Sequence, residues 1–329
     1  IANQEKVGFF YFTTKGVEFK EKIIKGKYYE QGIWKDKTFP FPDVVINAVN
    51  QKTKTQKHIY YKLETIIPYT SYPVGSKAFV YNKLKRSEYL KQFLIPYKEV
   101  KKNTDILVFL KKHKEIIVKP IRGHHGDHVV KIEEKNNYYK VVEKNNTYKF
   151  ELVELINYLD NLPKYKIVQK FIDSSVSSGE PFDFRLHLQK DKNGNWTITI
   201  IIPRVGSKNR VITNISQGSQ MMEFIKFLRN EFPEDANYVQ MQIEIFAIKF
   251  ATEFEKQYPY NFDELGIDIG FDKNKNIWVY EVNWRPGQIY IEVITARNTI
   301  NYAIYLARKR RNENWIIIYK FLKIMSLEK

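Results

Sequence analysis

The feature that most constrains the fold is the two-residue alternation at the start of the segment FDFRLHLQKDKNGNWTITIIIPRVG, residues 182–206. Apolar and polar side chains alternate there, with Phe182, Phe184, Leu186 and Leu188 against Asp183, Arg185, His187 and Gln189. Side chains two positions apart on a strand share a face, so the pattern predicts a strand with one buried and one polar face. Asn193-Gly194 then predicts a hairpin turn, and the residues up to Pro203 predict a second, antiparallel strand.

The rest of the chain mixes helices with further short strands. Apolar runs of strand type occur at KVGFFYF and PDVVINAV near the start, and at EIIVKP and YKIVQKFI further along. Helical patterns are predicted around residues 81–96, 217–231, 237–257 and 292–311. The regular alternation of strand and helix that is typical of a doubly wound parallel sheet does not occur. The order of elements therefore predicts an α+β fold.

Charge and composition favour some classes of partner and exclude several kinds of site. The 329 residues carry a formal net charge of +17, from 54 Lys and Arg against 37 Asp and Glu. Such an excess favours anionic partners, although the general abundance of Lys, Ile, Asn and Tyr favours the simpler interpretation of a Lys-rich solvated surface. The absence of cysteine excludes disulfides, thiolate metal sites and a Cys nucleophile. No apolar run reaches the roughly 18 residues of a transmembrane helix, and we expect a cytoplasmic protein without membrane partners.

A second pair of predicted strands carries polar side chains that a buried strand does not need. The stretch ELGIDIGFDKNKNIWVYEVNWRPG, residues 264–287, places Glu281 and Asn283 on one face, and the turn can fold Asp268 back against them. Two carboxylates and an amide oxygen suit Mg²⁺ or Mn²⁺ rather than zinc. Because Mg²⁺ usually takes part of its shell from phosphates, such a site implies a nucleotide. The polar outer face of an edge hairpin is the alternative, which this stretch alone does not exclude.

Cations suited to phosphate occur elsewhere in the chain. Lys119 ends an apolar strand, and the turn RGHHGDH at residues 122–128 has glycine N–H groups that could cover phosphate oxygens. Arg185 and Arg204 offer planar forks to phosphate or carboxylate. Taken singly, each has a simpler explanation, as a plain hairpin turn or as surface ion pairs. Asn214, in VITNISQG, has the simpler explanation of a helix cap or turn.

The order of these segments along the chain resembles a known superfamily. VKP, RGHHGDH, VQKFID, DFRLHL, PRVGS, TNISQG, GIDIGF and YEVNWRPG together resemble the ATP-grasp superfamily, and in particular the YheC/YheD group of endospore coat-associated proteins. The resemblance covers about residues 80–310 and implies two α+β subdomains that clamp ATP, preceded by a small N-terminal domain. It implies an N-terminal substrate region at residues 1–78 and a central subdomain with the phosphate-covering loop at 79–172. A C-terminal core with the metal site would follow at 173–311, and a C-terminal tail at 312–329.

The same resemblance implies a role for individual residues. The nucleotide would be bound by a strand-end lysine, a loop over the phosphates and a hinge around adenine and ribose, which are Lys119, Gly123, His125, Gly126, Gln169, Lys170, Ile172, Asp173 and Asn214. The metal ligands would be Asp268, Glu281 and Asn283. The arginines near the transferred phosphate and the acceptor carboxylate would be Arg185, Arg204 and Arg285. The loop departs from the family pattern, because histidines and Asp127 stand where serine and further glycines are common.

The activity implied by the resemblance is an ATP-dependent, ADP-forming carboxylate–amine ligase that forms an amide through an acyl phosphate. ATP with Mg²⁺ or Mn²⁺ would be the cofactors, and a carboxylate and an amine the substrates, with a peptide or an amino acid as candidates. A phosphotransferase, or a spore-coat structural or peptide-binding protein with a nucleotide site, is the alternative. Nucleic acid is not an expected partner, because no recognition motif occurs. The resemblance also implies an association with spores.

Overall fold

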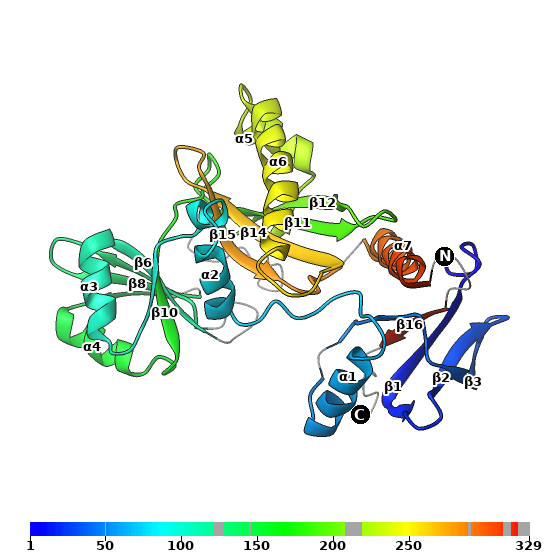
Figure 1. Cartoon of the computed structure of the whole chain (residues 1–329). Coiled ribbons are helices and arrows are strands. Elements are labelled where there is room, and N and C mark those ends of the chain that lie inside the picture. Colours follow the sequence, from blue (N-terminus) through cyan, green and yellow to red (C-terminus); the bar gives the residue numbers. More distant parts are fainter. Residues whose placement is uncertain are drawn as a thin grey trace.

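The structure is a computed structural model that describes residues 1–49, 51–121, 128–144, 146–207, 219–288, 291–311 and 317–321. The described elements form three β-sheets with helices packed against them (Figure 1), which confirms the predicted α+β class. In chain order the elements are β1 (Gly8–Glu18), β2 (Ile23–Glu30), β3 (Ile33–Pro40), β4 (Val44–Ile46), α1 (Lys54–Glu64), α2 (Lys77–Lys85), the 3₁₀ turn η1 (Leu90–Phe93), β5 (Tyr97–Glu99), α3 (Thr104–His113), β6 (Glu115–Pro120), β7 (Val130–Glu134), β8 (Tyr139–Glu143), β9 (Asn146–Phe150), α4 (Leu152–Asp160), β10 (Lys166–Lys170), β11 (Phe182–Lys190), β12 (Trp196–Val205), β13 (Gln220–Met221), α5 (Phe224–Glu231), α6 (Ala236–Glu255), β14 (Glu264–Phe271), β15 (Ile277–Asn283), α7 (Glu292–Arg311) and β16 (Ile317–Phe321). Across the described ranges, no helix combines the length and the apolar character needed to cross a membrane.

The first sheet has the strand order β3-β2-β1-β16-β4 and forms, with α1, what we call the N-terminal unit. Alternation along the strands divides its residues between two helices, since Phe10 and Phe12 pack with Leu63 of α1, whereas Val44 packs with Ala303 of α7. Strand β16 runs parallel to both β1 and β4. It lies within the segment expected to be a C-terminal tail, so part of that segment belongs to this sheet. The expected domain boundaries themselves stay a prediction.

The second sheet, of order β5-β10-β6-β7-β8-β9, is antiparallel and carries α3 and α4 on one face. Ile106 of α3 and Leu155 of α4 pack there in one core cluster with Val118 and Val168 of the sheet. Neighbouring positions on a strand face opposite ways, so Ile167 turns from this cluster into the core of the third sheet. The opposite face of the second sheet therefore looks toward the rest of the molecule.

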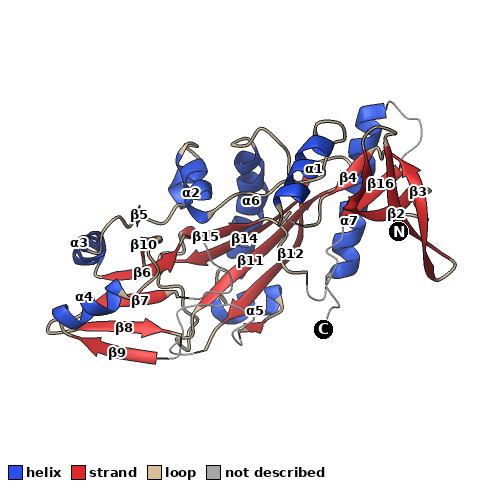
Figure 2. Ribbon diagram, turned by 90° about the horizontal axis from the view of Figure 1, so that it is seen from below, coloured by secondary structure: helices blue, strands red, loops and turns tan. Residues whose placement is uncertain are grey.

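The third sheet, of order β13-β12-β11-β14-β15, lies between the other two along the molecule (Figure 2). Its apolar face is covered by α5 and α6, because Phe184 and Ile267 pack in one large core with Phe227 of α5 and Phe250 of α6. The polar members of the β11 alternation occupy the other face. The hairpin predicted at Asn193-Gly194 joins β11 to β12, as the antiparallel register shows. We refer to the second and third sheets as the small and the large sheet.

The helices predicted at 237–257 and 292–311 appear as α6 and α7 within two residues of their expected bounds. The helix predicted at 217–231 is shorter, because α5 begins only at Phe224 and Gln220–Met221 form β13. The helical pattern predicted around residues 81–96 is divided into two elements in the structure. The structure has α2, which begins at the capping residue Ser76, and the separate turn η1. The physical reason lies at Ser87, whose Oγ accepts a hydrogen bond from the Leu90 backbone N–H at 3.2 Å and so starts a new turn.

The aromatic core of the large sheet generates a stability prediction. Phe184 has no exposed surface, and its ring lies 5.5 Å from those of Phe227 and Phe271. Phe184→Ala should lower the free energy of unfolding by about 3–5 kcal/mol, because it removes buried apolar surface and leaves a cavity. Urea unfolding monitored by circular dichroism measures this. Val108→Ala, at a position 69% exposed on α3, is the control and should change it by less than about 0.5 kcal/mol; a similar loss in both variants would contradict the prediction.

Candidate functional site

The polar face of the large sheet carries a row of charged side chains across three neighbouring strands. Arg185 of β11 lies opposite Asp268 of β14, which lies opposite Glu281 of β15. Directly opposed residues on adjacent strands project from the same face within about 5.5 Å at Cβ. The predicted pairing of Asp268 with the strand that carries Glu281 is thus confirmed. We call these three residues the charge row.

Asp268 is buried at the centre of this row and is held by two guanidinium groups. Arg185 donates from Nη2 to Asp268 Oδ2 at 2.9 Å and from Nε to Oδ1, while Arg204 Nη2 lies 3.2 Å from Oδ2. Arg204 also donates from Nε to Asp183 Oδ1 at 2.7 Å, across the β11–β12 pair. Burial acts to raise the pKa of the Asp268 carboxyl, but the charges of Arg185 and Arg204 outweigh burial and hold it below its usual range.

Glu281 and Asn283 lie two positions apart at the end of β15 and are more accessible than Asp268. The Glu281 side chain is 35% exposed, against 9% for Asp268. Lys77, the first residue of α2, has its Nζ 3.6 Å from Glu281 Oε1. The Asn283 side chain has no hydrogen-bond partner among the described residues. These two residues form the open end of the charge row.

The oxygen donors of this open end fit a hard divalent cation such as Mg²⁺ or Mn²⁺. The third predicted ligand differs, because both oxygens of Asp268 already accept from Arg185 and Arg204. Over the part of the chain that the structure describes, no cluster of three or more His, Asp or Glu side chains is arranged to hold a metal. Glu281 and Asn283 are therefore the pair open to a metal, and Asp268 reaches one only by giving up an arginine contact. All three remain predicted ligands.

Lys119 ends β6 of the small sheet and lies near the same end of the charge row. Its Nζ donates to Tyr81 OH at 2.9 Å, and Tyr81 OH donates to the backbone oxygen of Tyr280 at 3.1 Å. Burial lowers the pKa of the Lys119 ammonium to about 8, although the negative charge of Glu281 acts in the opposite direction. That influence shows that the lysine of one sheet and the glutamate of the other lie within electrostatic reach.

The predicted hinge residues lie at the end of β10, the strand next to β6, and just after it. Gln169 is buried, with its Nε2 3.5 Å from Tyr81 OH, so it belongs to the surroundings of Lys119. Lys170 is half-buried at the end of the strand, and Ile172 is buried just beyond it. Their contacts with adenine stay a prediction. The remaining predicted nucleotide residues lie outside the described residues: Gly123, His125, Gly126 and Asn214.

Asp173, the last predicted hinge residue, lies elsewhere than the charge row. Its carboxylate is 3.1 Å from Lys273 Nζ in the β14–β15 turn. Both residues line a cavity of about 450 Å³ whose floor includes Phe182 and Phe271, which belong to the helix-covered face of the large sheet. This cavity is thus distinct from the open end of the charge row, and the predicted approach of Asp173 to a ribose stays a prediction.

With this geometry in view, the chain can be compared with known proteins. A model of the YheC/D-like ATP-grasp family matches residues 66–306. The chain belongs to the YheC/D-like ATP-grasp family. The endospore coat-associated protein YheD of Bacillus subtilis (strain 168) is 24% identical over 325 residues, which cover 91% of this chain and 71% of YheD. The endospore coat-associated protein YheC of the same organism is 25% identical over 198 residues. This match covers 58% of this chain and 54% of YheC, so the chain spans about half of YheC.

Two solved structures share the ATP-grasp fold. N5-carboxyaminoimidazole synthetase from Staphylococcus aureus, complexed with ADP, has a TM-score of 0.50 and 11% identity, covering 84% of this chain and 62% of the synthetase. The D-alanine-D-alanine ligase from Coxiella burnetii has a TM-score of 0.50 and 12% identity, and the match covers 88% of this chain and 76% of the ligase. The chain thus spans less than two thirds of the synthetase. At such identities the likeness shows the fold alone, and it confirms the predicted ATP-grasp fold.

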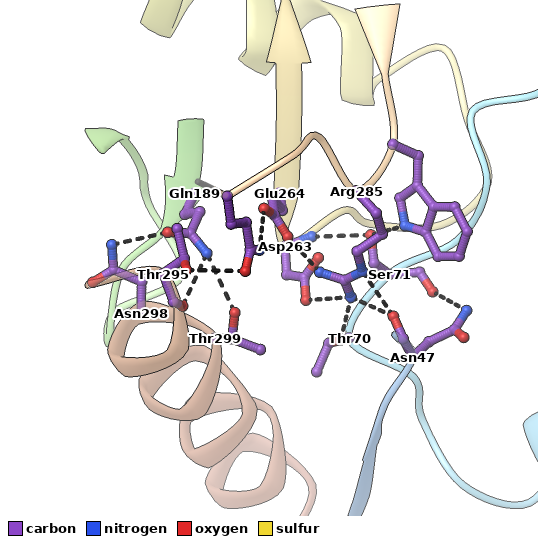
Figure 3. Close-up of polar contacts among 12 residues, drawn as sticks. Asn47, Thr70, Ser71, Gln189, Asp263, Glu264, Arg285, Thr295, Asn298 and Thr299 are labelled. Carbon is purple, nitrogen blue, oxygen red and sulfur yellow. Dashed lines mark hydrogen bonds and ion pairs between the residues drawn. The ribbon is translucent and has the colours of Figure 1, made fainter. Parts of the chain in front are cut away.

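In this ATP-grasp protein, Arg285 follows the open end of the charge row but turns into a separate buried network (Figure 3). Its Nη1 donates to Glu264 Oε2 at 2.7 Å, its Nη2 to Asp263 Oδ2 at 2.9 Å and its Nε to the Asn47 backbone oxygen at 2.8 Å. Its φ of +56° lies in the left-handed region that costs a non-glycine residue free energy. Arg285 therefore joins the N-terminal unit to the large sheet, and its catalytic role stays a prediction.

Glu264 extends this network through the ATP-grasp core to α7. It accepts from Gln288 Nε2 at 2.8 Å, and Gln288 accepts from Thr295 of α7 at 3.1 Å, which links Glu264 to Thr295 (Figure 3). Glu264 also lies 2.8 Å from His187 Nε2. Burial acts to raise the pKa of the Glu264 carboxyl, but the His187 hydrogen bond and the Arg285 charge outweigh burial and lower it to about 2. The network thereby fixes α7 against the sheet.

Sequence reasoning missed Lys77 and Tyr81 of α2, and it missed the acids Asp263 and Glu264 as partners of Arg285. For the two acids a signal exists, because they directly precede the fully buried run LGIDIGF and a buried charge needs a partner. For the α2 residues no local signal exists, since their contacts depend on how the helix packs against two sheets.

The ionised, buried state of Glu264 generates a pH prediction. A carboxyl whose folded pKa is lowered from 4.5 to about 2 stabilises the fold above pH 4.5 and loses that contribution as the pH falls toward 2. Glu264→Gln should cost about 3 kcal/mol of unfolding free energy at pH 7, and the gap to the wild type should close between pH 4.5 and 2. Urea unfolding at stepped pH measures this gap.

The matched control is Glu88→Gln, at a side chain that is 89% exposed. It should leave the free energy of unfolding within about 0.5 kcal/mol of the wild type at every pH. A gap between wild type and Glu264→Gln that is independent of pH would show that the loss comes from packing and would contradict the assignment of a lowered pKa.

Proposed function

We propose that the protein is an ATP-dependent, ADP-forming carboxylate–amine ligase. The observation that carries the proposal is the charge row, in which Arg185, Asp268 and Glu281 stand side by side while Lys119 of the facing sheet lies within electrostatic reach. A triphosphate in transfer needs a divalent metal and fixed cations around it. The membership in the ATP-grasp family supports this use of the site.

The predicted residues at the open end of the charge row can be given roles that fit their surroundings. Lys119 would hold the non-transferred phosphates as an ammonium, and Gln169 would border the nucleotide beside it. Glu281 and Asn283 would hold the metal ion, which when bound neutralises charge on the triphosphate. Arg185 keeps its Nη1 group without a partner among the described residues, because Nε and Nη2 bind Asp268. That group would stabilise charge on the transferred phosphoryl.

The proposed reaction needs positioning more than a covalent protein group. A substrate carboxylate oxygen attacks the γ-phosphorus, a P–O bond forms, and the bond to the leaving ADP oxygen breaks. The amine nitrogen then attacks the acyl carbon, the C–N bond forms, and inorganic phosphate leaves with the electron pair while the amine loses a proton. The guanidinium of Arg204, held by Asp183 and Asp268, would keep Arg185 and the carboxylate in place throughout.

The substrates proposed are a carboxylate and an amine, with a peptide or an amino acid as the first candidates. The positive charge of the chain, +17, supports an acidic acceptor. The two curated relatives are described as endospore coat-associated, and we place the proposed activity in the cytoplasm of a spore-forming cell.

The test is a screen of ATP, Mg²⁺, amino acids and short peptides, read by mass spectrometry for nucleotide and amide products. ADP together with a new amide is expected. Glu281→Ala should lower turnover by at least about 100-fold, because it removes a ligand of the metal ion that neutralises charge on the reacting phosphates. Glu99→Ala, an exposed position on β5, should leave turnover unchanged. Release of AMP, or a phosphorylated product without amide, would overturn the ligase proposal, the latter in favour of a phosphotransferase.

The lowered pKa of Lys119 generates a second prediction for this function. Because the free ammonium titrates near pH 8, ADP affinity should fall as the pH rises from 7 to 9.5, by up to about tenfold for each pH unit above that pKa. Lys119→Arg keeps its charge over this range and should bind ADP with a flat pH profile. Isothermal titration calorimetry measures both, and an equal pH dependence in the two proteins would contradict the role of Lys119.

A further inference from the structure

Helix α2 contacts both halves of the candidate site through one of its faces. Lys77 and Tyr81 lie four positions apart, so they project from the same side of the helix. Tyr81 is 1% exposed and binds Lys119 of the small sheet and the Tyr280 backbone of the large sheet. Lys77 reaches Glu281, the residue next to Tyr280. The contacts of Tyr81 thus fix the position of α2, and this position places Lys77 beside Glu281 at the open end of the charge row.

The position of Lys77 is unfavourable for the helix itself. It is the first residue after the capping residue Ser76, whose side chain accepts from the Phe79 backbone N–H. The positive end of the helix dipole lies there and disfavours a cation, whereas the first turn of α2 has no acidic residue. The Lys77 side chain is nevertheless only 19% exposed, and its ammonium lies 3.6 Å from Glu281. The attraction to Glu281 acts against this unfavourable effect of the helix dipole.

We propose that Lys77 is a resident counter-ion of Glu281, which neutralises this carboxylate in the metal-free protein and competes with the divalent metal for it. The inference rests on the proposed function, since it takes Glu281 as a metal ligand. Arg185 and Arg204 are committed to Asp268, so Lys77 supplies the cation for the open end. A divalent ion bound to either oxygen of this carboxylate repels the ammonium and takes up the negative charge that holds it. The metal and Lys77 therefore compete for Glu281.

The displacement has a consequence for the order of binding. When the metal binds alone, loss of the contact between Lys77 and Glu281 reduces the free energy gained, so the metal binds the nucleotide-free site weakly. A metal that arrives with a nucleotide brings phosphate oxygens, and the released ammonium can pair with them. Lys77 thus makes occupancy of the metal site depend on the nucleotide, which keeps the site from filling with metal in its absence.

The test is titration of Mn²⁺ into nucleotide-free protein, followed by the EPR signal of the free ion. In Lys77→Met the dissociation constant for Mn²⁺ should fall by roughly threefold to tenfold, the range expected for loss of a half-buried competing ion pair. Lys77→Arg should bind like the wild type, because it keeps the competing charge. Lys111→Met, an exposed position on α3, removes an equal charge far from Glu281 and should also bind like the wild type.

Unchanged or weaker Mn²⁺ binding in Lys77→Met would overturn the inference. The same holds if Lys77→Met weakens ADP binding in EDTA while Mn²⁺ binding stays unchanged, since Lys77 would then serve the phosphate only. Glu281→Gln separates this inference from the proposed function. If that variant binds Mn²⁺ like the wild type, the metal assignment of the proposed function fails; if it loses Mn²⁺ while Lys77→Met equals the wild type, only the role of Lys77 fails.

Discussion

The convergence of two guanidinium groups on the buried carboxylate of Asp268 is the interaction on which the polar face of the large sheet depends. A carboxylate in that position is costly unless it is paired and hydrogen-bonded. Arg185 and Arg204 provide both conditions, and Asp183 balances the second guanidinium. The arginines of β12 and β11 thus balance the carboxylates of β11 and β14, and the charge row ends at Glu281 on the edge strand β15.

A second buried network, centred on Arg285, holds the units of the molecule together. Two carboxylates from the start of β14 and a backbone oxygen of the N-terminal unit surround its guanidinium. The strained backbone of Arg285 is maintained because these contacts over-determine its position. Helix α7 packs between the first and the large sheet and is tied to the same network through Thr295. The N-terminal unit is therefore joined to the large sheet by these polar contacts and by the apolar packing of α7 on the first sheet.

The charged residues around Arg285 and those at the open end of the charge row differ in what they can bind. The carboxylates around Arg285 pair with its guanidinium inside the protein. Glu281, Asn283 and Lys119 instead lie where a bound ligand would change the balance of charge. Helix α2 relates Lys119 to Glu281, because Tyr81 contacts Lys119 and the Tyr280 backbone while Lys77 lies against Glu281. This separation is the physical basis for assigning nucleotide chemistry to the open end of the charge row.

The sequence by itself determined the hairpins of the large sheet, their buried and polar faces, and the pairing of Asp268 with the strand of Glu281. It could do so because a period of two and a turn such as Asn193-Gly194 are local properties of the chain. The order of the motifs also identified the ATP-grasp family, which the matched residues 66–306 confirm. The tertiary structure alone decided which cation meets which carboxylate: both arginines on Asp268, Lys77 on Glu281, and Arg285 on Asp263 and Glu264. Such pairs form between side chains that only packing brings within contact distance, and Coulomb attraction depends on that distance and on burial, neither of which a local pattern encodes.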